Sequence, residues 1–345
     1  MRLPSTNIYT LSTLFLIPIH TVSYSWISNC SFEGYPDLHF TPPDLFTPNA
    51  TSDWGPNGPT AGKRVIEVIP SWSLSTLGNN NNKSTWETVH HAIYLPTDWS
   101  SIGSKFPILV EYTGNGPWND TFGDISTGLP EYANMGFGIS GGVGFIWLSL
   151  PFLDITGRYI ETYWWGCPSN SSKPVGQCPG YYNATPTLQY MKEALRWVAS
   201  TYNGDLDNAF ITGWSRGALA VNYFGLFDDE AAKLWKGLLP YSHFDGQPSD
   251  LWVPYPNHDT NSAIERLKRL NGKPLFITAE RNNSLETIEY LNTTGLTLNV
   301  TVMSTGFCNH NDQWTLRPSK ARDAMREWIK NVIAMKGNDN INQTH

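Results

Sequence analysis

The pentapeptide GWSRG at residues 213–217 has the composition of a turn that exposes a reactive serine. It lies between an apolar run at 208–214 and a helical pattern at 216–227. A tight strand-to-helix turn strains the backbone of its serine and exposes the hydroxyl, and small flanking residues let neighbouring chains approach. We therefore predict that Ser215 is a nucleophile. The alternative is a turn whose glycines only serve packing.

The elements that must position this serine alternate along the chain. Apolar, β-branched and aromatic runs predict strands, and amphipathic patterns predict helices. The alternation indicates one α/β domain at 63–336, with a mostly parallel, doubly wound sheet and helices on both faces. The predicted strands are 64–69, 87–96, 106–113, 141–152, 208–214, 236–244, 273–280 and 297–304, and the predicted helices are 185–200, 216–227, 262–270, 284–291 and 319–335.

From about residue 62 to the C-terminal helix, the chain resembles the α/β-hydrolase superfamily. The stretch YLPTDWSSIGSKFPILVEYTGNGPW at 94–118 is similar to the second strand, third strand and oxyanion loop of secreted esterases and polyester-depolymerase-like enzymes. GWSRG resembles both those esterases and the prolyl-oligopeptidase group. The resemblance implies an α/β-hydrolase fold and the order Ser, acid, His along the chain.

The resemblance places the catalytic histidine between the last strand and the C-terminal helix, where His310 lies in GFCNHNDQW. Of the other histidines after Ser215, His345 ends the chain, His258 lies in a loop rich in Pro, Asn and Asp, and His243 closes an earlier strand. We predict that His310 is the base. A structural histidine held by loop backbone is the alternative.

The acid departs from the family pattern. Where the family usually has an aspartate after its seventh strand, this chain has Asn282. An amide can orient an imidazole but cannot stabilise the imidazolium by charge. Glu280, at the end of that strand, and Asp245, at the end of the sixth strand, are the two replacements, and both stay open.

Two backbone N–H groups are expected to form an oxyanion hole. One belongs to Arg216, directly after the nucleophile, and the other to Asn115, after the third strand. Gly114 and Gly116 on either side of Asn115 allow close backbone approach. This chemistry needs no cofactor. Neither C-x-x-C nor a paired histidine spacing is present, so no metal site is predicted.

Composition excludes several other classes of protein. Of the 345 residues, 40% are hydrophobic and only 15% are charged, which indicates a folded domain. The net charge of −7 and the lack of a Lys/Arg-rich run argue against nucleic-acid binding. No apolar stretch reaches the roughly 18 residues of a membrane-spanning helix.

The ends of the chain predict secretion. Residues 1–25 read as a signal peptide, 26–62 as an extended N-terminal segment and 337–345 as a polar tail. The sequence also has ten N-x-[ST] sites, about twice the number expected by chance, which predicts a glycoprotein. They begin at Asn29, Asn49, Asn82, Asn119, Asn170, Asn183, Asn282, Asn292, Asn299 and Asn342.

The 4 cysteines of a secreted chain suggest disulfide bonds. Cys167 and Cys178 flank a short loop, which favours a local bridge and leaves Cys30 to pair with Cys308.

We therefore expect a secreted serine hydrolase that cleaves a small-molecule or polymeric carboxylic ester through an acyl-enzyme intermediate. A peptidase of the prolyl-oligopeptidase kind and a non-catalytic binding protein with a hydrolase fold are the alternatives. The sequence does not specify the oligomeric state.

Overall fold

The computed structural model describes residues 43–52, 59–73, 89–119, 125–162, 183–251, 253, 255–280 and 283–335. The predicted signal peptide, much of the extended segment, the polar tail and three of the cysteines lie outside the described residues. The proposed cysteine pairings therefore remain predictions.

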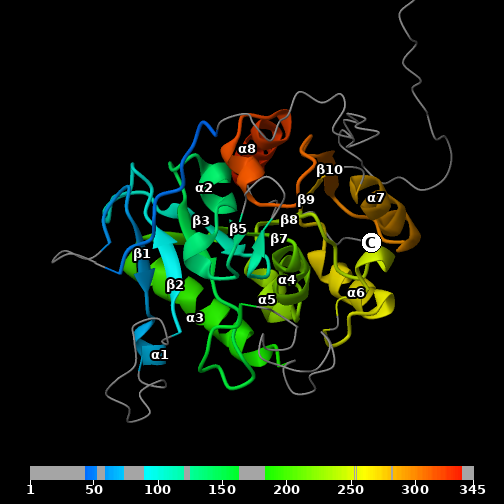
Figure 1. Cartoon of the computed structure of the whole chain (residues 1–345), viewed down its shortest axis with the longest axis horizontal. Helices are drawn as coiled ribbons and strands as arrows, with labels where there is room; N and C mark the ends of the chain where they lie inside the picture. The colour runs from blue at the N-terminus through cyan, green and yellow to red at the C-terminus, as the bar shows by residue number, and fades with distance from the viewer. Residues whose placement is uncertain are drawn as a thin grey trace, which may run out of the picture.

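An eight-stranded sheet runs through the centre of the described chain (Figure 1). β2 is antiparallel to both of its neighbours, and the other pairs are parallel. This confirms the predicted mostly parallel sheet and gives an α/β-hydrolase-like fold. In order across the sheet, the strands are β1 (Arg64–Glu67), β2 (His91–Tyr94), β6 (Ile146–Leu150), β3 (Phe106–Tyr112), β7 (Gly204–Trp214), β8 (Gly237–Tyr241), β9 (Leu275–Ala279) and β10 (Val300–Ser304).

Helices cover both faces of this sheet, because its central strands are apolar on both sides. In β3, Ile108 and Val110 belong to one core cluster and Leu109, between them, to another. The first cluster includes residues of α3 (Thr185–Thr201), α4 (Arg216–Gly225), α5 (Asp229–Lys233), α6 (Thr260–Leu267) and α7 (Asn283–Thr293). The second includes residues of α2 (Met135–Ser140) and α8 (Lys320–Ala334).

Short elements fill the connections. They are α1 (Pro70–Ser73), the hairpin of β4 (Trp118–Asn119) and β5 (Ile125–Ser126), and the 3-10 helices η2 (Pro130–Tyr132), η3 (Pro248–Asp250), η4 (Lys268–Leu270) and η5 (Gln313–Leu316).

Every strand and helix predicted from the sequence is found, with shifted ends. The run at 141–152 is strand only over 146–150, because Gly141 ends α2 in the left-handed conformation. β7 begins at Gly204, four residues before the predicted start. Helices α1, α2 and α5 were not predicted.

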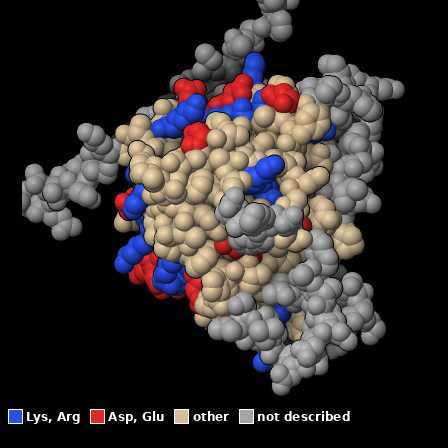
Figure 2. Space-filling view, turned by 90° about the vertical axis from the view of Figure 1, so that its left-hand side faces the viewer, with Lys and Arg blue, Asp and Glu red and all other residues tan. Residues whose placement is uncertain are grey.

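The surface seen from the β1 edge is made mostly of uncharged residues (Figure 2). In its described part, acidic and basic side chains are intermixed and form no continuous basic patch. The described part of this face therefore offers no extended cationic surface to an anionic polymer.

Helix α2 depends on a buried carboxylate of β3. Glu111 accepts hydrogen bonds from the backbone N–H groups of Met135 (3.0 Å) and Gly136 (2.8 Å) and from Trp147 Nε1 (2.8 Å). Burial raises the pKa of Glu111, although these bonds and the charge of Arg64 oppose the rise. The carboxyl group satisfies donors at the start of the helix that have no partner within it.

Replacing Glu111 with alanine removes the acceptor of all three bonds and leaves a cavity. We expect Glu111→Ala to lower the free energy of unfolding by about 3 kcal/mol or more, and Glu111→Gln, which keeps one acceptor oxygen, by less. Urea titration measures both. The exposed Glu265 is the control, because Glu265→Gln should change stability by less than about 0.5 kcal/mol. Equal stability of Glu111→Ala and the native protein would contradict the capping role.

Candidate active site

Ser215 occupies the turn between β7 and α4, as predicted. Its backbone has φ 55° and ψ −124°, a conformation that residues other than glycine rarely adopt. Its N–H donates to the carbonyl of Tyr241 at 3.1 Å. A Cβ at Gly213 would overlap the backbone of Gly217, and one at Gly217 would overlap the carbonyl of Tyr112. Both glycines are therefore required by close backbone packing around the serine.

The structure brings His310 together with Glu280. His310 follows β10, and Glu280 directly follows β9. His310 Nδ1 lies 2.8 Å from Glu280 Oε1, with the histidine side chain 27% exposed and the carboxylate buried. Burial alone would raise the pKa of Glu280, but the charge and hydrogen bond of His310 lower it to about 2. The carboxylate therefore stays ionised at neutral pH.

Asp245, the other acid considered from the sequence, has different partners. Its two oxygens accept from Arg266 Nε and Nη2 at 2.7 and 2.8 Å, and from the Tyr255 hydroxyl at 2.6 Å. The Asp245 carboxylate, which Arg266 contacts through both oxygens, is fully buried. Asp245 thus holds α6 against the loop after β8, and Glu280 rather than Asp245 contacts His310. Asn282 lies outside the described residues.

A second serine joins the pair, and the sequence analysis did not single it out. The Ser242 hydroxyl donates to Glu280 Oε1 at 3.0 Å and lies 2.9 Å from His310 Nδ1. Ser242 directly follows β8, with φ 85°, and its N–H donates to the carbonyl of Thr278 in β9. Because β8 and β9 are parallel neighbours, their carboxyl ends bring Ser242 beside Glu280. The sequence feature that could have indicated Ser242 was a hydroxyl residue near the end of the strand predicted at 236–244.

Aromatic rings enclose the His310 imidazole on two sides. The centroid of the Trp214 ring lies 4.9 Å from that of His310, and the centroid of the His243 ring lies 5.3 Å away. Burial would lower the pKa of His243, but its 2.6 Å hydrogen bond to Asp250 and the charge of that carboxylate raise it. His243 thus lies beside the His310 ring, and the carboxylate to which His243 is hydrogen-bonded is that of Asp250.

Arg216, one of the two predicted oxyanion donors, directly follows Ser215 as the first residue of α4. Asn115, the other, lies in the loop after β3. Gly114, next to Asn115, follows β3 closely, and a Cβ there would lie 2.6 Å from the Trp214 ring. The loop after β3 therefore packs directly against the residue that precedes Ser215.

Helix α2 is connected to the loop of His310. Asn134, just before α2, places its amide nitrogen 3.1 and 3.2 Å from the two carboxylate oxygens of Asp312. Asp312 is two residues after His310. The start of a helix on one face of the sheet thus fixes the segment that carries the histidine.

In the described ranges, no three His, Cys, Asp or Glu side chains come together as metal ligands. None of the described helices combines the length and the apolar character needed to cross a bilayer.

Comparisons with known proteins give similar folds only. No family model and no curated protein matches the sequence. Similar solved structures include FphF, a fluorophosphonate-binding serine hydrolase of Staphylococcus aureus, with 12% identity over 79% of this chain and 99% of that chain and a TM-score of 0.45. The S-formylglutathione hydrolase FrmB of Staphylococcus aureus has 14% identity over 74% and 97%, with a TM-score of 0.44.

A thermostable esterase has 14% identity, with a TM-score of 0.41, and the match spans 70% of this chain but only 59% of the esterase. Likeness at this level carries no argument about activity. The arrangement of the strands themselves gives the conclusion that the chain has an α/β-hydrolase-like fold.

Proposed function

We propose that the protein is a serine hydrolase that cleaves carboxylic esters through an acyl-enzyme intermediate. The observation that carries this proposal is the 2.8 Å hydrogen bond between His310 and the buried Glu280, with the His310 ring against Trp214, the residue before Ser215 in its strained turn. In this scheme Glu280 is the acid, because it holds Nδ1 of the imidazole and directs Nε2 to act as the base.

The reaction proceeds in two steps. Ser215 Oγ attacks the ester carbonyl carbon while His310 Nε2 takes the hydroxyl proton, and the Arg216 and Asn115 N–H groups stabilise the oxyanion. The C–O bond to the alcohol then breaks, and His310 returns the proton to the leaving oxygen. Water, deprotonated by His310, attacks the acyl-enzyme, releases the carboxylic acid and regenerates Ser215.

The proposal includes secretion, supported by the N-terminal pattern and the excess of N-x-[ST] sites. Substrates are carboxylic esters, small or polymeric.

Labelling with a fluorophosphonate probe tests the nucleophile. We expect Ser215 to be phosphonylated in the native protein, and both Ser215→Ala and His310→Ala to abolish the labelling. His258→Ala is the matched control, because His258 bonds the carbonyl of Tyr255 and should leave labelling unchanged. A folded native protein that is not labelled would contradict catalysis. Faster turnover of peptides than of esters would favour the peptidase alternative.

Two isosteric substitutions distinguish the acids. We expect Glu280→Gln to lower kcat by about 10³- to 10⁴-fold with little change in stability, because the amide cannot stabilise the imidazolium. Asp245→Asn should instead lower the free energy of unfolding by about 3–5 kcal/mol, because it leaves Arg266 buried without its charged partner. Steady-state kinetics and urea unfolding of both variants measure these effects. The opposite pattern would assign the acid to Asp245.

Ser242 acts in this scheme as a positioning residue that holds Glu280 and His310 in line. We expect Ser242→Gly to lower kcat roughly tenfold with KM unchanged, because it removes a hydrogen bond to a charged group. Glycine accepts the φ of 85° without strain, so any fall in the melting temperature reflects the lost hydrogen bond to Glu280 and not the backbone. If Ser242→Gly retains the native kcat, the hydroxyl does not position the pair and only the turn matters.

A further inference from the structure

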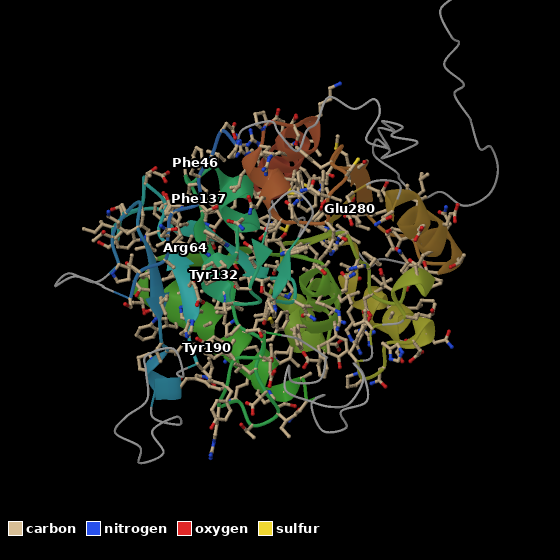
Figure 3. The ribbon with its side chains drawn as sticks, viewed as in Figure 1. Phe46, Arg64, Tyr132, Phe137, Tyr190 and Glu280 are labelled. Atoms are coloured by element: carbon tan, nitrogen blue, oxygen red, sulfur yellow. The ribbon has the colours of Figure 1, made fainter. Side chains whose placement is uncertain are left out.

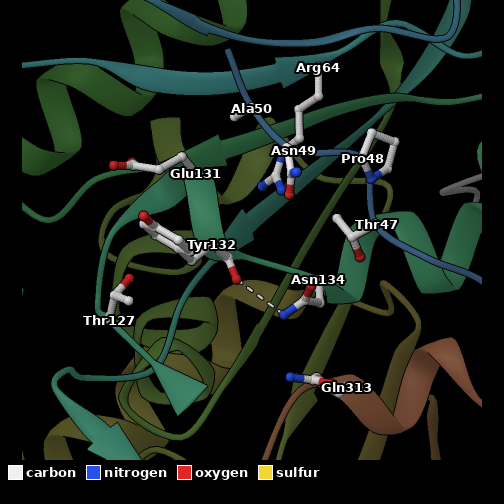
Figure 4. A pocket seen from close by; sticks show the side chains of 10 residues that line it. All are labelled: Thr47, Pro48, Asn49, Ala50, Arg64, Thr127, Glu131, Tyr132, Asn134 and Gln313. Atoms are coloured by element: carbon white, nitrogen blue, oxygen red, sulfur yellow. Dashed lines mark hydrogen bonds between the residues drawn. The ribbon is translucent and has the colours of Figure 1, made fainter. Parts of the chain in front are cut away.

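A pocket of about 530 Å³ is lined in part by Asn134 and Gln313, close to the loop of His310, but by none of the proposed catalytic residues. Figure 3 shows Glu280 well separated from Arg64 and Tyr132, which line this pocket. The pocket is bounded by the segment 47–50, the start of β1, the loop after β5, η2, the residue before α2 and the start of η5. The lining residues are Thr47, Pro48, Asn49, Ala50, Arg64, Thr127, Glu131, Tyr132, Asn134 and Gln313 (Figure 4).

The lining combines apolar surface with one cation and one anion. Arg64 and Glu131 are both buried, at 3% and 7% exposure. Within the described residues, Thr47 Oγ1, Arg64 Nε and Glu131 Oε1 have no hydrogen-bond partner. The ring of Tyr132, in contrast, is 54% exposed. Amide, hydroxyl and charged groups beside an exposed aromatic face suit a sugar ring, whose hydroxyls donate and accept and whose C–H face packs on the aromatic ring.

Asn49 brings a sugar attachment site to this pocket. It begins the sequence Asn49-Ala50-Thr51, is exposed and lines the pocket. In Figure 4 its side chain projects toward the middle of the lining residues, as does that of Arg64. Thr51 fixes the segment to β1, since its N–H donates to the Arg64 carbonyl at 3.2 Å and its carbonyl accepts from Ile66 at 2.9 Å. The acceptor nitrogen is therefore held at the pocket wall.

We propose that Asn49 carries an N-linked glycan whose first N-acetylglucosamine units are seated in this pocket against Tyr132. The inference rests on the proposed secretion. The host transferase joins Asn49 Nδ2 to the anomeric carbon of a lipid-linked oligosaccharide, and the lipid pyrophosphate and one amide proton leave. A volume of about 530 Å³ lies within the roughly 300–1,000 Å³ of pockets that enclose small ligands. The seated sugars brace the segment 43–52 against the sheet.

Two other described sites provide matched controls. Asn292, in α7, and Asn299, before β10, are both exposed and neither lines the pocket. The protein secreted by a yeast host would be analysed by mass spectrometry for occupancy at Asn49, Asn292 and Asn299. The folded protein would then be digested with endoglycosidase H, which cuts between the first two sugars.

We expect the Asn49 glycan to be released at least tenfold more slowly than the control glycans. Tyr132→Ala should bring its release to the rate of the controls, because the exposed ring is the platform on which the sugar packs. Equal rates in the native protein would overturn the inference, and so would an unoccupied Asn49 beside occupied controls. Absence of glycan at all three sites would also overturn the inference, whereas failure of the protein's own N-terminal segment to direct it into the medium would overturn the proposed secretion. Fluorophosphonate labelling of the same preparation tests catalysis independently of either result.

Discussion

The charge of Glu280 is the constraint on which the arrangement of the candidate active site depends. An ionised carboxylate buried at the carboxyl end of a parallel sheet is costly unless charged and hydrogen-bonding partners surround it. Here the partners come from neighbouring strand ends, with Ser242 after β8 and His310 after β10. The hydrogen bonds that stabilise the charge also hold the His310 imidazole, because Ser242 and His310 bond the same carboxylate oxygen. The same bonds therefore keep the carboxylate ionised and fix the proposed base.

Other buried acidic residues of the sheet are also held by several hydrogen-bonding partners. Glu67, in β1, accepts from Trp197 Nε1 and the Tyr202 hydroxyl at 2.7 Å each, and lies 3.0 Å from His91. Its pKa is lowered because these bonds and the charge of His91 outweigh burial, which alone would raise it. Glu111 and Asp245 are likewise held by several donors. These acids join β-strands to helices and loops, whereas Glu280 contacts His310, the proposed base.

The order of strands and helices and the serine turn could be predicted from the sequence, because both follow from local residue patterns. The apolar run of β3 reflects burial, and the glycines around Ser215 reflect close packing. Both can be recognised from residues that are adjacent in the sequence. The choice between Glu280 and Asp245 could not be made from sequence, since each follows a buried strand and only the tertiary partners differ. Arg266, which pairs with Asp245, is 21 residues further along the chain. Helix α2 was missed because its glycines oppose helix formation and its capping group lies 24 residues earlier.

Helix α2 has a wider consequence than its length suggests. Only six residues long, it cannot be stable by its own hydrogen bonds, and it persists through Glu111 at one end and packing against the sheet. Asn134, at its start, also bonds both oxygens of Asp312 in the segment of His310. The helix therefore links the interior of the sheet to the segment of His310. The alignment of His310, the proposed base, thus depends on the stability of a local unit much smaller than the whole fold.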